Sequence, residues 1–236
     1  MGFLLTMARV AAVAACMAGA MLLPGQALAK EYGHYDFKLV LVPAASPGTA
    51  GRLDVGYLDR MMRDVGQHAS NYPPHFDSAQ DQQRAQRDVG SLMGMLDAGF
   101  GTAAPPELLL RMGILGSFGH NLQIPNAAAY AQARFIKLLQ AKPGDAMANY
   151  HYGQLLSGTG RVTEALPYLT KAKDKGVVPA LYALGMAHLA QGDKAKAIEM
   201  LSAYQQAQPA DQSVGKLIQG ISGGKVEAKQ VGGKRW

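Results

Sequence analysis

The sequence has one cysteine and one tryptophan among 236 residues, and 17% of its residues are charged. The cysteine, Cys16, lies in an N-terminal segment that we expect to be removed on export. The mature chain then has no cysteine, which excludes disulfide bonds, thiolate metal sites and cysteine nucleophiles. The remaining composition has no low-complexity tract and is typical of a globular protein.

Residues 1–29 have the pattern of a secretory signal peptide. Arg9 precedes a mostly apolar run from Val10 to Leu23, and Ala27-Leu28-Ala29 is the small-x-small sequence that signal peptidase cuts. The run is shorter than the roughly 20 apolar residues that a membrane-spanning helix needs. We therefore predict cleavage after Ala29 and a periplasmic or secreted protein, exported by a bacterial-type route.

Cys16 supports an alternative to this cleavage. The sequence Val13-Ala14-Ala15-Cys16 resembles a bacterial lipobox, in which the thiol is lipidated and the cysteine becomes the new N-terminus. However, the 13 residues that follow, up to Ala29, are mostly apolar, whereas lipoproteins usually continue with a polar linker. A lipid-anchored envelope protein is the alternative localisation, and we expect membrane association only if Cys16 is lipidated.

The chain is moderately basic, with a formal net charge of +6 that falls to +5 without Arg9. The cations are scattered or lie in the C-terminal tail, at Lys225, Lys229, Lys234 and Arg235. Such a charge attracts acidic surfaces weakly, and scattered cations are typical of a solvated surface. We therefore expect no nucleic-acid partner.

Two segments precede the main pattern of the chain. Residues 30–52 are predicted to be extended or loop, because the short apolar run from Phe37 to Val42 has no visible partner strand. Residues 53–104 are predicted to form a helical hairpin. Its first helix is expected to begin its exit at Gly66, and its second to start at Ser78, with Asp81 near the positive end of the helix dipole.

Residues 105–222 contain a repeated pattern. Gly119, Gly153 and Gly185 lie 34 and 32 residues apart, and each is followed after 12 residues by alanine and after 16 by a large apolar residue. Small residues at this period are typical of units of two closely packed antiparallel helices. The residues predicted to pack the repeats are Gly119, Ala131, Phe135, Gly153, Ala165, Leu169, Gly185, Ala197 and Leu201.

These repeats resemble the tetratricopeptide family, and the stretch from Lys171 to Gly185 is also similar to Sel1-type repeats. Both resemblances imply an all-α fold, a right-handed α-solenoid of about three helical hairpins near residues 112–145, 146–178 and 179–210. The hairpin at residues 53–104 is expected to cap its N-terminal end, and a helix beginning near Asp211 to close its C-terminal end. Residues 223–236 are predicted to form a disordered basic tail.

Some residues depart from the family's pattern. Asn149 occupies a position that is usually large and apolar, and Tyr204 replaces a usually small residue. Gly113 and Gly116 are expected to interrupt the first helix of repeat one, which makes it the least regular repeat. In the later repeats, Gly160 and Gly192 are expected to end the first helices in the left-handed conformation, which costs least in glycine.

No set of residues in the sequence predicts catalysis or a bound cofactor. The six histidines include no pair at the i, i+4 spacing that helical zinc sites favour, and the carboxylates form no acid–base pair. The turn Gly158-Thr159-Gly160 lacks the lysine and the preceding strand of a phosphate-binding loop. We therefore expect a protein that is not an enzyme and that has no metal site or cofactor.

The resemblance implies that the positions three before and one after each glycine face the groove of the solenoid. The first set is Gly116, Tyr150 and Tyr182, and tyrosine is enriched in binding surfaces. Family members that grip a peptide carboxylate use lysine, arginine and asparagine at such positions, so an apolar or mixed peptide groove is favoured here. The peptide-binding residues that we predict are His120, Tyr150, Gln154, Tyr182 and Met186.

The predicted function is therefore that of an exported adaptor or scaffold. It would bind a peptide segment of another envelope protein on its concave face, and the identity of that partner is not predicted. A self-associating structural component, or an accessory subunit, of an envelope assembly is the alternative.

Overall fold

The computed structural model describes residues 31–42 and 52–226. The predicted signal peptide with Ala29, the candidate lipidation site Cys16 and residues 227–236 lie outside this part of the chain. The helices within it are α1 (Val55–Ala69), α2 (Ala79–Gly99), α3 (Pro106–Asn121), α4 (Ala127–Ala141), α5 (Ala146–Gly158), α6 (Val162–Asp174), α7 (Pro179–Ala190), α8 (Lys194–Ala207) and α9 (Gln212–Ser222).

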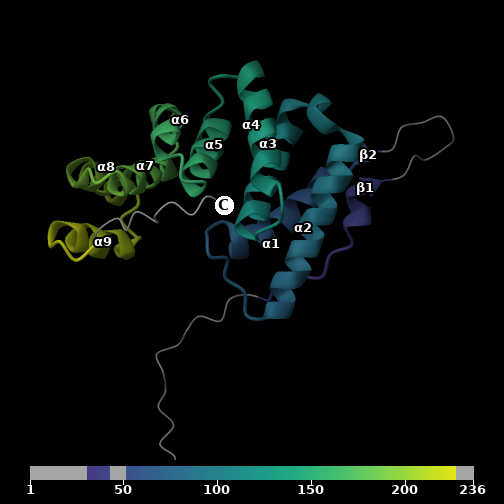
Figure 1. Cartoon of the computed structure of the whole chain (residues 1–236), viewed down its shortest axis with the longest axis horizontal. Helices are drawn as coiled ribbons and strands as arrows, with labels where there is room; N and C mark the ends of the chain where they lie inside the picture. Colours follow the sequence, from purple (N-terminus) through teal and green to yellow (C-terminus); the bar gives the residue numbers. More distant parts are fainter. Residues whose placement is uncertain (1–30, 43–51, 227–236) are drawn as a thin grey trace, which may run out of the picture.

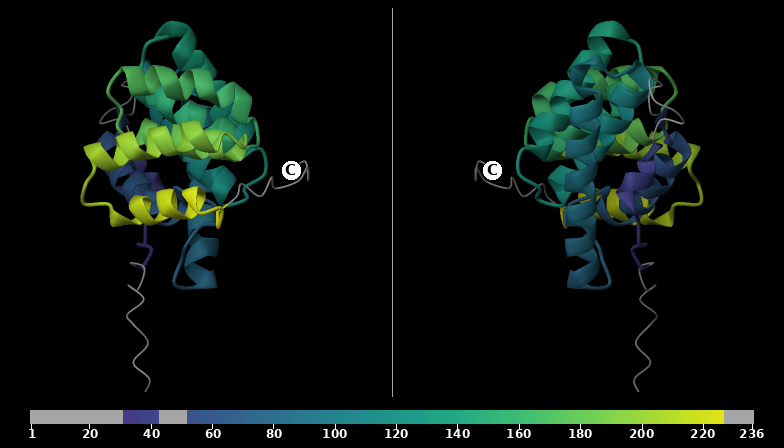
Figure 2. Two further views of the ribbon diagram at one scale, coloured as in Figure 1. Left: turned by 90° about the vertical axis from the view of Figure 1, so that its left-hand side faces the viewer. Right: turned by 90° about the vertical axis from the view of Figure 1, so that its right-hand side faces the viewer.

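The protein is an all-α solenoid, as the repeat pattern predicted. Three helical hairpins, α3/α4, α5/α6 and α7/α8, follow one another in an arch, with α1 and α2 at one end and α9 at the other (Figure 1). Viewed from the ends of the arch, helices of successive hairpins lie in layers (Figure 2). Each hairpin buries its apolar side against its neighbours, which is how repeat proteins form a core.

The N-terminal helices α1 and α2 both pack against α3. The Arg111 guanidinium of α3 forms an ion pair with the Asp59 carboxylate of α1, with nitrogen–oxygen distances of 2.7 and 3.0 Å. A second ion pair joins the buried Arg134 of α4 to Asp97 of α2. The predicted cap of the first repeat is therefore attached by charged groups as well as by apolar packing.

Local sequence signals set most helix ends. The Ser78 hydroxyl caps α2 by accepting a hydrogen bond from the Asp81 amide at 3.0 Å, as predicted. Gly160 and Gly192 have φ angles of +80° and +81° and follow α5 and α7, which confirms the expected left-handed ends. One expected end is wrong: Gly66 lies within α1, where the Phe118 ring of α3 approaches the space that its Cβ would fill.

The segment before α1 differs from the extended segment that the sequence predicted. A 3₁₀ turn, η1 (Phe37–Val40), leads into a two-residue strand, β1 (Leu41–Val42). This strand pairs antiparallel with β2 (Arg52–Leu53), where Leu41 lies opposite Leu53. The partner strand lies directly before α1, so an apolar run that had no visible partner in the sequence has one in the fold.

The first repeat is continuous, contrary to the expectation that Gly113 and Gly116 interrupt it. Both glycines lie inside α3 and face α4. A Cβ on Gly113 would lie 2.5 Å from Phe135 Cε1, and one on Gly116 would lie 2.9 Å from the Ala131 Cβ. These positions require glycine because the two helices approach too closely for any side chain.

Gly119 therefore does not have the role that the spacing assigned to it. A Cβ there would contact Ala127 at the start of α4 and Met93 in α2, rather than Phe135. In the later repeats, Gly153 faces Leu169 and Gly185 faces Leu201. The connection between α3 and α4 spans residues 122–126, whereas those of the later hairpins span only 159–161 and 191–193. The longer connection shifts the contacts of α3 along α4.

The C-terminal end is closed by α9, which buries Val214 and Ile221. The chain remains ordered beyond residue 223, where the disordered tail was expected to begin. Gly224 has a φ of +68°, and the amides of Lys225 and Val226 donate to the Gly220 carbonyl oxygen. These bonds terminate the helix, and the Val226 side chain packs beside Gly220. In the part of the chain that the structure describes, no helix is both long and apolar enough to cross a membrane.

Candidate interaction surface

The first helices of the hairpins line the inner side of the arch (Figure 1). On α7, Tyr182 and Met186 lie one helical turn apart and are 38% and 37% exposed, which is high for large apolar side chains. Gln154 on the neighbouring α5 is also exposed. We call Tyr150, Gln154, Tyr182, Met186 and Tyr204 the inner patch.

Aromatic contacts join the helices under this patch. The Tyr182 ring meets the Tyr204 ring edge-on, with centroids 5.5 Å apart, and the Tyr204 hydroxyl lies 3.4 Å from an Asp211 carboxylate oxygen. Burial raises the pKa of the half-buried Tyr150, and the neighbouring Gln154 side chain partly opposes this shift. Tyr150 therefore remains neutral near pH 7, and the inner patch presents apolar area with hydroxyl and amide groups.

Tyr204 was missed as a site residue, although its sequence signal was present. It stands where the repeat usually has a small residue, and in the structure its larger ring extends from α8 to Tyr182 on α7. His151 was also missed, and no spacing rule indicated it. The centre of its ring lies 4.9 Å from that of the Tyr150 ring, and Gln154 is a neighbour.

Burial lowers the pKa of His151 from its ordinary value of 6.5 to about 4. As pH falls, the unfolded chain therefore takes up this proton before the folded chain does. The stability that neutral His151 contributes is complete above pH 6.5 and is lost as pH falls through 4. An NMR titration of the ring should give a midpoint near 4, and urea midpoints should depend less on pH in His151→Gln between pH 6.5 and 4.

A matched control for this titration is His34→Gln, which replaces an exposed histidine far along the chain. Its urea midpoints should still fall between pH 6.5 and 4, because His151 is unchanged. A His151 midpoint close to 6.5 would contradict the burial that the structure gives this ring.

His120 lies near the end of α3 and approaches the backbone of Gly158, at the end of α5. It is half-buried, and desolvation lowers its pKa. Gly116, which the family pattern also placed in the groove, is buried against Tyr130 and Ala131 of α4. The burial of Gly116 follows from the shifted contacts of the first repeat. The structure thus brings together Tyr150, Gln154, Tyr182 and Met186.

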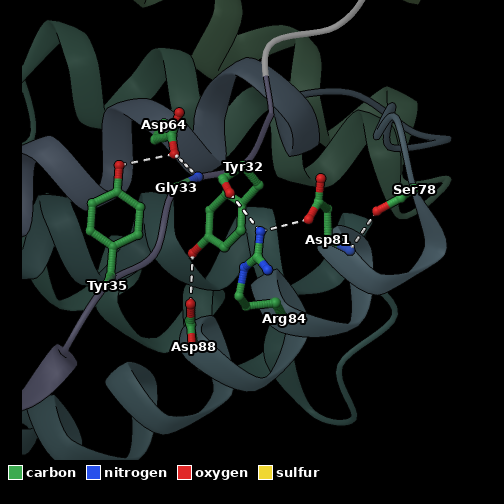
Figure 3. Close-up of polar contacts among 8 residues, drawn as sticks. All are labelled: Tyr32, Gly33, Tyr35, Asp64, Ser78, Asp81, Arg84 and Asp88. Carbon is green, nitrogen blue, oxygen red and sulfur yellow. Dashed lines mark hydrogen bonds and ion pairs between the residues drawn. The ribbon is translucent and has the colours of Figure 1, made fainter.

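A second polar cluster holds residues 31–36, which we call the N-terminal strap, against α1 and α2 (Figure 3). The Tyr32 side chain is fully buried, and its hydroxyl donates to Asp88 Oδ2 at 3.1 Å. Arg84 donates to the Tyr32 carbonyl oxygen at 2.7 Å and to Asp81 Oδ1 at 2.6 Å. Burial and the nearby Asp88 raise the pKa of Tyr32, so this phenol stays protonated at neutral pH.

Asp64 of α1 holds the rest of the strap. Its Oδ2 accepts hydrogen bonds from the Gly33 amide at 2.8 Å and from the Tyr35 hydroxyl at 2.9 Å (Figure 3). Desolvation and this bond raise the pKa of Tyr35 to about 12. All these groups bond to one another, which indicates a structural attachment of the strap rather than a site for a ligand. Among the described residues, no three metal-ligating side chains are grouped together.

Comparison with known proteins agrees with the geometry of the hairpins. Two models of the tetratricopeptide repeat match the chain, one at residues 127–176 and the other at residues 158–221. Together the matches run from α4 into α9 and leave out α3, the helix whose packing is shifted. No curated protein matches the chain.

Residues 127–221 therefore contain helical repeats of the tetratricopeptide type, within an all-α solenoid. Repeats of this type generally mediate protein–protein interactions, which suggests an interaction adaptor or scaffold.

Proposed function

We propose that this protein is an exported adaptor that holds a peptide segment of another envelope protein against its inner patch. The observation that carries the proposal is the exposure of Tyr182 and Met186 on the inner side of the arch, next to Gln154. A rigid surface that is already formed binds without a large ordering cost. The neutral patch favours a short helix or an extended segment with apolar side chains.

The export part of the proposal is supported by the sequence pattern of residues 1–29. Mass spectrometry of the protein recovered from cells tests it directly. Cleavage after Ala29 leaves a chain that starts at Lys30, whereas lipidation leaves a longer chain that carries acyl groups on Cys16. A mass that retains Met1 would contradict both routes.

The binding part is tested by exchanging exposed residues of the inner patch. Tyr182→Ser with Met186→Ser removes apolar area without opening the core. The partner is first identified by pull-down from an envelope extract, and its affinity is then measured with purified proteins. We expect the double variant to bind at least ~10-fold more weakly, a loss of about 1.4 kcal/mol.

The control for this experiment is Leu39→Ser, which removes a side chain that is 56% exposed on η1, away from the repeats. It should bind the partner as the unaltered protein does. Equal affinity of all three proteins would overturn the inner patch as the binding surface. Light scattering distinguishes the self-association alternative, because a stable oligomer that is lost in Tyr182→Ser with Met186→Ser would identify a second copy as the partner.

A further inference from the structure

We infer that the protein has a second binding site, on the outer side of the repeats, which takes a tryptophan side chain of an acidic partner segment. The site is a cavity of about 250 Å³ between the second helices α4 and α6, with α5 beneath it. Its lining residues are Ile136, Leu139, Gln140, Pro143, Asn149, Tyr152, Tyr168 and Lys171.

This cavity is separate from the inner patch. On α5, Asn149 and Tyr152 line the cavity, whereas Tyr150 and Gln154 belong to the inner patch. Successive residues of a helix are turned by about 100°, so these two pairs lie on different faces of α5. The two sites can therefore be altered independently, and failure of one proposal leaves the other intact.

Asn149 carries the inference. It is 1% exposed, and its amide nitrogen donates to the carbonyl oxygens of Pro143 at 3.0 Å and Asp145 at 2.7 Å. These two bonds fix the orientation of the amide, and no donor among the described residues reaches its Oδ1. The equivalent position of the third repeat is Leu181, so packing alone does not require asparagine here. Buried acceptors are normally paired, and an unpaired one indicates a site for a donor.

The walls of the cavity favour an aromatic occupant. The Tyr152 and Tyr168 rings meet edge-on with centroids 4.7 Å apart, and Ile136 at the rim is 37% exposed. Aromatic rings prefer such edge and offset contacts with one another. Tryptophan adds an indole N–H, which only donates, to match the Oδ1 of Asn149. This oxygen is covered in the free protein, so we expect the side chains that line the cavity to move apart as the indole enters.

The charge at the rim favours an acidic segment around that tryptophan. Lys171 lines the cavity, its Nζ lies 6.0 Å from the centre of the Tyr168 ring, and it has no carboxylate partner among the described residues. An added aromatic ring would also lie within reach of this cation. The chain's own tryptophan, Trp236, follows Lys234 and Arg235, whose charges repel Lys171. An acidic partner is therefore favoured over the basic C-terminal segment.

The probe is a capped pentapeptide, acetyl-Gly-Asp-Trp-Asp-Gly-amide, titrated into ¹⁵N-labelled protein and followed by NMR. We expect shifts of the Asn149 side-chain amide and of the backbone near Tyr152 and Lys171. The matched peptide with phenylalanine in place of tryptophan lacks the donor and should bind at least ~10-fold more weakly.

Three variants locate the binding. Asn149→Leu copies the residue of the third repeat and should remove the preference for tryptophan over phenylalanine. Ile136→Arg changes an exposed residue and should abolish binding by blocking the rim, while Tyr182→Ser with Met186→Ser should bind the probe normally.

Three results would overturn the inference. The first is that neither peptide shifts the cavity residues. The second is that the two peptides bind equally well to the unaltered protein. The third is that Trp236→Phe changes the Asn149 signals before any peptide is added, because the chain's own tryptophan would then occupy the cavity.

Discussion

Replacing Tyr32 with alanine is expected to lower the free energy of unfolding by about 3–5 kcal/mol, the range measured for removing large buried aromatic side chains. Tyr32 is fully buried and packs near the His68 and Phe76 rings, with centroids 6.1 and 6.2 Å away. The variant also leaves the half-buried Asp88 without its tyrosine hydrogen bond. Because each unit of a repeat protein is supported by its neighbours, loosening this end should also destabilise α3.

Urea unfolding followed by circular dichroism measures this loss. Tyr32→Phe keeps the ring and removes only the hydroxyl, so we expect a loss of about 1 kcal/mol. Tyr72→Ala is the matched control, since this tyrosine is 57% exposed, and its effect should stay within about 0.5 kcal/mol. A loss below about 1 kcal/mol for Tyr32→Ala would mean that the strap does not support the helical core in solution.

Gly113→Ala is the second substitution with a large expected effect. Alanine normally stabilises a helix interior by about 1 kcal/mol relative to glycine. Here the new methyl group would lie 2.5–2.8 Å from three carbons of the buried Phe135 ring, and overpacking of this kind costs about 1–3 kcal/mol. We expect the clash to exceed the gain, so that the net stability falls by up to about 2 kcal/mol.

Gly94→Ala is expected to change the stability of the protein in the opposite direction. Gly94 also lies inside a helix, α2, but nothing approaches within 4 Å of the position of its Cβ. This variant should gain about 0.5–1 kcal/mol. Urea midpoints of Gly113→Ala and Gly94→Ala, measured in parallel with the unaltered protein, test both expectations. If both alanines stabilise the protein, the close approach of α3 and α4 that the structure describes would be wrong.

The second and third repeats were predictable from the sequence because their contacts are local. In each, the glycine and the leucine that meet are 16 residues apart, across a connection of three residues. The same spacing misassigned Gly119. Its repeat has a longer connection, and the pattern contains no signal for how that extra length shifts α3 along α4.

The inner patch was predictable only in part, for a related reason. Tyr150, Gln154, Tyr182 and Met186 follow from repeat positions, whereas His120 was placed by the misassigned Gly119. Tyr204 reaches the patch from a second helix, a contact that depends on the packing of α7 against α8. The N-terminal strap and the outer cavity likewise form between segments that no repeat position relates.

The sequence by itself determined that the chain is a solenoid of helical hairpins, because the spacing of small and large apolar residues is a property of each unit alone. It also determined most helix ends, which depend on single capping residues such as Ser78 and Gly160. The tertiary structure alone decided that Gly113 meets Phe135 and Gly116 meets Ala131, contacts that the spacing had assigned to Gly119. It also decided that Tyr32 anchors the strap and that Asn149 lines a cavity. These features depend on the distance between helices that are separate in the sequence. That distance is set by the summed packing of many side chains rather than by any local pattern.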